Sequence, residues 1–233
     1  MNTRELLGQL YLLQVNDSLF PIGGYSHSYG LETYIQEDAV HDLATAEEYI
    51  RKKLAYSFLY TDLLAVRLAF DAAECADYPA LSRLEEILEA SRLPLELREA
   101  SKKLGSRFVK TVSGLTIPWK DDSFQIYREQ QKGTSICHPC AYGVFCEALG
   151  LSRRDALAHF LYAQTSAMVT NCVKTIPLSQ TSGQKLLSSL FPFFEELLDQ
   201  AERASADMLC ASAPGFDLSS IRHETLYSRL YMS

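Results

Sequence analysis

Apolar residues recur along this chain at the three- and four-residue spacing of an amphipathic helix. Near the N-terminus Leu6, Leu10 and Leu13 share one face and predict a helix over about residues 4–15. Pro21 and the glycines that follow it interrupt the pattern. Beyond them the same spacing predicts helices over residues 28–35, 45–75 (one helix with a break, or two), 79–91, 94–112, 139–149, 156–173, 182–190 and 192–209.

Capping residues favour several of these helix ends. Thr45 with Glu48, and Ser152 with Asp155, have the spacing of a capping box, in which two side chains bond the free amides of a first turn. Gly150 is placed to end the helix before it. No alternating run between turn residues predicts a strand. We therefore expect an all-α, single-domain helical bundle packed around a central buried helix over residues 156–173.

Composition narrows the class of protein. The chain has 233 residues, is 47% hydrophobic and carries a formal net charge of -7. This length can bury one sizeable core, and the acidic balance argues against sequence-independent binding to nucleic acid. The 156–173 stretch lacks charged residues but contains too many polar groups for a membrane span. The first residues do not resemble a signal peptide, so the six cysteines are expected to be reduced thiols in the cytoplasm.

The segment from Pro21 to Glu32 is dense in Gly, Ser and His, and it admits enzymatic interpretations. Ser26 and Ser28 near Gly24 approximate a nucleophile elbow, and His27 could act as a general base. An elbow must follow a strand, however, and here a helix and a loop precede it. We favour a turn whose glycines permit a tight backbone, with Ser26 or Ser28 capping the next helix.

A second candidate is Cys137-His138-Pro139-Cys140, whose two thiols and imidazole could bind zinc or nickel. No second Cys-x-x-Cys motif completes a four-ligand site, and the alternative is a pair of small buried cysteines at a helix start. A third candidate is Lys174, which lies where a cation complements the end of a helix and could also contact a partner.

The end of the chain forms the last candidate. Residues 211–220 have the composition of a polar linker, which divides an all-helical domain of residues 1–220 from a tail of residues 221–233. Tyr and Arg are enriched at interface hot spots, so the tail predicts a partner-binding segment that is loosely packed until bound. In the alternative interpretation the tail is the last piece of the core, with His223 and Glu224 as internal hydrogen-bond partners.

Four segments together resemble the UreF family of urease accessory proteins. The block Leu19–Glu32 is similar to the family's Pro-x-Gly-x-aromatic-Ser-x-Ser-x-Gly-Leu-Glu signature, and residues 97–105 are similar to a weaker motif. Residues 173–184 resemble its basic-x-x-Pro-Leu-Gly-Gln-x-x-Gly-Gln segment, and residues 223–231 its His-Glu-x-x-Tyr-Ser-Arg-Leu-Phe ending. The departures are small: Ser179 replaces a usual Gly, Leu226 a common Gln, and Tyr231 a Phe.

The resemblance implies an all-helical, cytoplasmic homodimer without catalytic activity, cofactor or resident metal. It implies a complex with the scaffold UreD (also called UreH) and the GTPase UreG, which engages apo-urease for GTP-dependent nickel insertion. A metal-binding chaperone using Cys137, His138 and Cys140 is the alternative. The residues that the resemblance assigns to partner binding are Glu32, Lys174, His223, Glu224, Tyr227, Ser228, Arg229, Leu230 and Tyr231. Its further motif residues, structural or facing a partner, are Pro21, Gly23, Tyr25, Ser26, Ser28, Gly30, Pro177, Gly183 and Gln184.

Overall fold

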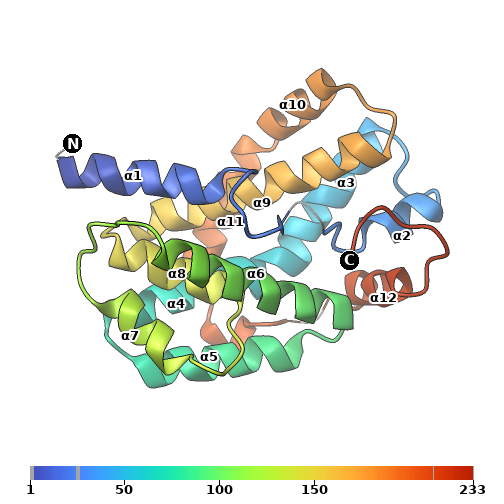
Figure 1. Ribbon diagram of the computed structural model, residues 1–233. Helices are drawn as coiled ribbons and strands as arrows, with labels where there is room; N and C mark the ends of the chain where they lie inside the picture. Colours follow the sequence, from blue (N-terminus) through green and yellow to red (C-terminus); the bar gives the residue numbers. More distant parts are fainter. Residues whose placement is uncertain (1–2, 25–26, 212, 233) are drawn as a thin grey trace.

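Helices make up the regular structure of the computed structural model, which describes residues 3–24, 27–211 and 213–232 (Figure 1). Within these residues there is no strand, and the all-α, single-domain prediction is confirmed. The elements in chain order are α1 (Thr3–Asn16), α2 (Leu31–Gln36), α3 (Leu43–Lys53), η2 (Leu54–Leu63), α4 (Leu64–Glu74), α5 (Tyr78–Ser91), α6 (Leu95–Ser113), α7 (Ser123–Gln130), α8 (His138–Ala148), α9 (Arg153–Thr175), α10 (Gln180–Ser189), α11 (Phe191–Arg203), η3 (Ala206–Met208) and α12 (Pro214–His223).

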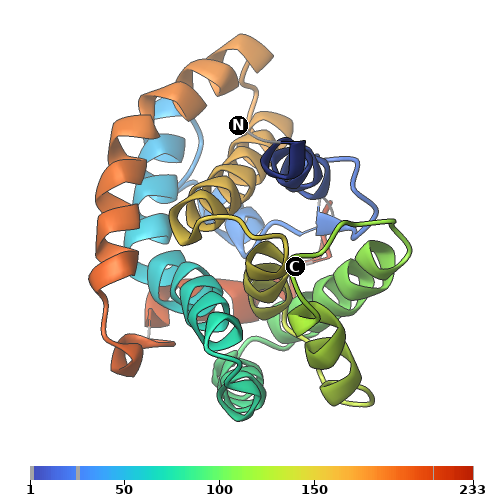
Figure 2. The same cartoon turned by 90° about the vertical axis from the view of Figure 1, so that its left-hand side faces the viewer.

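The helix at the centre of the fold is α8. Every residue of α8 is buried, and α4, α6, α7 and α9 pack around it (Figure 2). Gly143 permits the close approach of α4, because a Cβ there would lie 2.5 Å from the carbonyl oxygen of Val66. The expected central helix, α9, is buried along one side and leaves Tyr162 exposed on the other. That part of the prediction is therefore not confirmed.

Of the two predicted capping boxes, the Ser152 cap is correct and the pairing of Thr45 with Glu48 is wrong. The Ser152 hydroxyl accepts a hydrogen bond from the Asp155 amide, as expected, and starts α9. The earlier helix begins at Leu43, two residues before the predicted start, because Asp42 is its cap and accepts from the Thr45 amide at 2.8 Å. Thr45 is the third residue of the helix, and its hydroxyl accepts a hydrogen bond from the Asp42 amide. The capping box therefore pairs Asp42 with Thr45 and does not involve Glu48.

The predicted break in the 45–75 segment is a change of helix type. Residues Leu54–Leu63 form a π-helix, η2, which joins α3 to α4 without a turn between them. A π-helix inserts extra backbone into each turn, is rare, and is often found at functional sites. It rotates the faces of α3 and α4 relative to one another, which explains why one apolar periodicity does not fit the whole segment.

The C-terminal part differs from the prediction. The stretch expected to be a linker contains α12, whose first residue is Pro214, a position where proline is favoured. The predicted boundary between residues 220 and 221 therefore falls inside a helix. α12 packs against α2 and α6 at the end of the molecule where the chain ends (Figure 1). In the part of the chain that the structure describes, no helix is long and apolar enough to cross a membrane.

Candidate functional site

Three helix ends meet beside the C-terminal residues. Glu32 lies in the first turn of α2, Glu96 in the first turn of α6, and His223 in the last turn of α12. Acidic side chains are stabilised near a helix N-terminus and basic ones near a C-terminus. Each of the three residues therefore lies at the helix end that favours its residue type. These three residues form what we call the Glu32–His223–Glu96 cluster.

His223 is the centre of this cluster and is completely buried. Its Nε2 lies 2.9 Å from Oε2 of Glu32, and its Nδ1 lies 2.7 Å from Oε2 of Glu96. Carboxylate oxygens accept hydrogen bonds, so both contacts are made when both ring nitrogens carry a proton. The geometry therefore matches an imidazole ring that bridges two carboxyl groups, with one ring nitrogen within hydrogen-bond distance of each.

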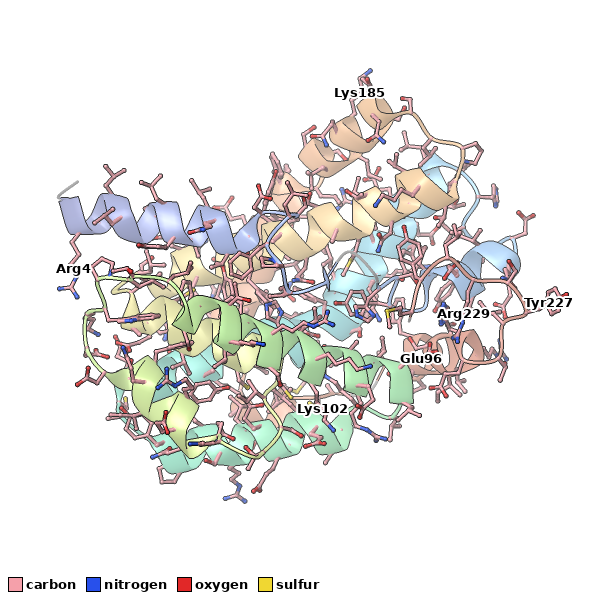
Figure 3. All side chains as sticks on the ribbon, viewed as in Figure 1. Arg4, Glu96, Lys102, Lys185, Tyr227 and Arg229 are labelled. Atoms are coloured by element: carbon pink, nitrogen blue, oxygen red, sulfur yellow. The ribbon has the colours of Figure 1, made fainter. Side chains whose placement is uncertain are left out.

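Both carboxylates also hold the chain beyond α12. Glu32 accepts hydrogen bonds from the backbone amides of Leu230, at 2.7 Å, and Tyr231, at 3.1 Å. The guanidinium of Arg229 donates to Glu96, and the two side chains lie together in Figure 3. The C-terminal segment is thus fastened to α2 and α6 through the same two residues that enclose His223.

Two further contacts hold this segment, one at its start and one near its middle. The Glu224 carboxylate accepts from the amide of Leu95 at 2.9 Å, where it caps the start of α6. The Gln36 side chain donates to the carbonyl oxygen of Ser228 at 2.8 Å. The interpretation in which His223 and Glu224 are internal hydrogen-bond partners is therefore confirmed.

Docking of the segment leaves large apolar side chains in solvent. Tyr227 is fully exposed and extends away from the fold in Figure 3, and Leu230 is 78% exposed. Met232 is also exposed, whereas Tyr231 is buried against the protein. We call Tyr227, Leu230 and Met232 the C-terminal surface. Exposed aromatic and aliphatic side chains on a fixed backbone are the residue types that fill partner pockets.

The N-terminal motif explains how α12 comes so close to α2. Gly30 has φ +84°, and a Cβ on it would lie 3.2 Å from Cα of Ser220 in α12. Glycine adopts this left-handed conformation without steric cost and leaves room for the helix. Thr33 then donates to the carbonyl oxygen of Ser219 at 2.8 Å. The motif therefore places Glu32 against His223.

Other residues of this motif have local roles. Gly23 also has a positive φ, and a Cβ there would lie 2.6 Å from a guanidinium nitrogen of Arg107. Pro21 is exposed and Ser28 is buried, with a hydroxyl that bonds to no described residue. The other two predicted motif residues, Tyr25 and Ser26, lie outside the described residues. The favoured interpretation, with serines capping the next helix, is wrong for Ser28, because α2 has Gly30 as its cap.

The second group of predicted residues lies apart from the cluster. Lys174 is exposed in the last turn of α9, and no hydrogen bond or ion pair joins it to the described cluster residues. Pro177 and Gln184 are exposed as well. Gly183 is buried, and a Cβ there would lie 2.5 Å from a methyl carbon of Val173, so it lets α10 pack on α9.

The cysteine candidates lie in the core. Cys137 and Cys140 are buried at the start of α8, and burial raises the pKa of both thiols. Glu85 accepts from the Cys137 amide at 2.7 Å and from the Tyr127 hydroxyl. Among the described residues, no three His, Cys, Asp or Glu side chains are arranged to share a metal ion. His138 contributes aromatic packing, with its ring 5.4 Å from that of Phe108.

His27, which could act as a general base, is buried in the loop that precedes α2. Its pKa is lowered by burial and then by the nearby charges of Lys103 and Arg107. Its carbonyl oxygen accepts from the Asn171 side chain at 2.8 Å, which ties the loop to α9. No described strand precedes it, so the nucleophile-elbow interpretation has no structural basis.

Two residues of this site were not singled out from the sequence: Glu96 in the cluster, and Gln36 beside it. An acidic residue directly after Pro94 and Leu95 is a common helix-start pattern, and its position in the first turn was the one available indication. Gln36 carried no indication, because its role depends on contact with a segment 192 residues away.

The chain is similar both to a protein-family model and to individual known proteins. The UreF family pattern matches residues 40–191, more than half of the chain. The urease accessory protein UreF of Actinobacillus pleuropneumoniae serotype 5b (strain L20) is 35% identical over 231 residues, covering 97% of this chain and 100% of that protein. The protein of the same name from serotype 3 (strain JL03) is also 35% identical with the same coverage.

Proposed function

The chain belongs to the UreF family of urease accessory proteins, and from this premise we propose that it acts as a non-catalytic scaffold in urease maturation. It binds UreD (also called UreH) and the GTPase UreG, and the complex engages apo-urease for GTP-dependent nickel insertion. Nickel is the cargo of this process. The scaffold works as a homodimer in the cytoplasm, as the family resemblance implies.

The observation that carries the proposal is the C-terminal surface. Tyr227, Leu230 and Met232 are exposed on a segment whose backbone is fixed by Glu32. Burying a large apolar side chain contributes roughly 1.5–3 kcal/mol, so three of them supply substantial binding free energy. A segment that is already ordered loses less entropy on binding than a free tail does. We therefore assign UreD/UreH to this surface.

The partner-binding residues have two kinds of role in this proposal. Tyr227 and Leu230 contact the partner directly, because their side chains are free to do so. Glu32 and His223 are buried and position the segment, so their first assignment as contacts is replaced by an indirect one. Lys174 is exposed on another part of the fold and is proposed to contact UreG or another part of the complex.

Co-purification from cells that express the urease subunits, UreD/UreH and UreG tests the proposal. The variant Tyr227→Ala with Leu230→Ala is expected to lose UreD/UreH and to abolish urease activation, with circular dichroism unchanged. The matched control is Tyr56→Ala, which removes an exposed tyrosine from the π-helix. Full activation by the double variant, or equal loss in the control, would contradict the assignment.

A further inference from the structure

A cavity of ≈ 210 Å³ lies inside the fold, away from the C-terminal surface. Its walls come from the π-helix η2, the starts of α6 and α8, the middle of α9 and the first turn of α12. Phe58, Phe160 and Met168 give it an apolar side. A cavity of about 150 Å³ is large enough for benzene, so this one has room for a small organic molecule.

Lys53 lines this cavity and is only 7% exposed. Its ammonium lies 4.7 Å from the ring centroid of Phe216 and makes no hydrogen bond or ion pair with any described residue. An ammonium has three donors, and leaving them unmatched in a buried site costs free energy. Burial lowers the pKa of Lys53 to about 8, against the opposing effects of Asp62 and Asp217. The group is thus charged at neutral pH and lacks an acceptor.

Asp217 lines the same cavity from α12 and carries the opposite charge. Its carboxylate makes no hydrogen bond or ion pair with a described residue, and burial raises its pKa. The other two charged residues in the wall, Arg92 and Asp62, form a salt bridge, with 2.7 Å between a guanidinium nitrogen and a carboxylate oxygen. Lys53 and Asp217 therefore stand in one cavity as separate positive and negative groups, without direct contact.

We propose that this cavity binds a small zwitterion, whose anionic group pairs with Lys53 and whose cationic group pairs with Asp217. The formal charges of the four charged residues in the wall add up to zero. This balance favours a ligand that has no net charge but carries one positive and one negative group. An apolar portion of the ligand packs on the rings of Phe58 and Phe160. An α-amino acid with an aliphatic side chain has these three features and a suitable size.

Ser101 provides a separate indication that the cavity holds a polar ligand. Its side chain is buried and lines the cavity, and its hydroxyl makes no hydrogen bond of normal geometry with a described residue, its polar neighbour being the weakly bonding thiol of Cys137. Buried polar groups are nearly always hydrogen-bonded in folded proteins. A ligand with a carboxylate or an amine satisfies this hydroxyl as well as the two charged groups.

Isothermal titration calorimetry with three probes of the same carbon skeleton tests the proposal at neutral pH. L-leucine carries both charges, 4-methylpentanoate only the carboxylate, and L-leucinamide only the amine. We expect L-leucine to bind at least about tenfold more tightly than either single-charge probe. The binding of all three with equal affinity, or the failure of L-leucine to bind at millimolar concentration, overturns the proposal.

Variants then assign the two poles. Lys53→Met and Asp217→Asn are each expected to weaken L-leucine binding at least about tenfold. Lys52→Met is the control, because Lys52 is exposed and paired with Glu48. If Lys53→Met fails to fold, Asp217→Asn alone decides the test. L-leucine binding that is unchanged in Asp217→Asn overturns the proposal, and co-purification with UreD/UreH is expected to remain intact in both variants.

Discussion

Glu32 and His223 stand 191 residues apart in the chain and are joined by a 2.9 Å contact between Oε2 and Nε2. The same carboxylate accepts hydrogen bonds from the backbone amides of Leu230 and Tyr231. One residue of the N-terminal motif thus connects the last helix to the segment that follows it. The two terminal motifs of the sequence are, in the folded protein, parts of one structure.

Removal of the imidazole is expected to destabilise the fold. In His223→Ala the carboxylates of Glu32 and Glu96 lose the imidazole that contacts both of them, and leaving a buried polar group without its hydrogen bond costs about 1–3 kcal/mol. Urea denaturation measures this loss of unfolding free energy. The control is His41→Ala, which removes an exposed histidine paired with exposed Asp38. A loss in His223→Ala no larger than in the control would show that the cluster is not a stabilising contact.

The two arginines near the end of the chain are expected to differ in effect. Arg229 holds the segment to Glu96, whereas Arg222 pairs with Glu37 on the open surface. Arg222→Ala is expected to change the unfolding free energy by no more than ~0.5 kcal/mol. Arg229→Ala is expected to reduce the hydrogen-exchange protection of the Leu230 and Tyr231 amides. Unchanged protection of both amides would mean that Glu32 alone fixes the segment.

The pH dependence of stability is expected to carry a contribution from Glu85. Burial raises the pKa of Glu85 to about 7, against hydrogen bonds from Tyr127 and Cys137 that oppose the shift. Between the ordinary carboxyl pKa and about 7, the folded state binds a proton that the unfolded state has released. This contribution is therefore fully present below the ordinary pKa and is lost as the pH rises through about 7.

Glu85→Gln tests this contribution, because an amide can donate to Tyr127 and accept from the Cys137 amide without titrating. We expect the unfolding free energy of the variant, relative to the intact chain, to improve as the pH rises from 5 to 8, by an amount on the order of 3 kcal/mol. Parallel pH profiles for the two proteins would show that Glu85 does not titrate in this window.

Much of the fold could be predicted because its helices carry local indications. A helix, α1, does form where Leu6, Leu10 and Leu13 recur, although these leucines are exposed and the buried apolar side chains of α1 are those of Leu12 and Val15. Ser152 does cap α9. α12 was missed since its Pro, Gly and Ser residues have the composition of a linker. Two of those serines, Ser219 and Ser220, are buried against α2, where small side chains allow close packing. Tertiary contact therefore decided the structure of a segment with weak local preference.

The site could be predicted only in part, for a related reason. Family resemblance pointed to Glu32 and His223, but not to their contact with each other or with Glu96. Contacts between distant segments leave no periodic pattern in a single sequence. The same limit applies to the cavity, because Lys53 and Asp217 have no unusual sequence context. Burial makes these residues distinctive, and burial at such positions follows from packing of the whole fold.

The affinity of UreD/UreH for a shortened chain tests the central claim most directly. A chain ending at Leu226 keeps His223 and Glu224. It lacks the C-terminal surface and the backbone amides that donate hydrogen bonds to Glu32. We predict that it retains its helical content and a cooperative melting transition, while its binding to purified UreD/UreH is lost. A folded shortened chain that binds UreD/UreH as tightly as the intact protein would contradict the account.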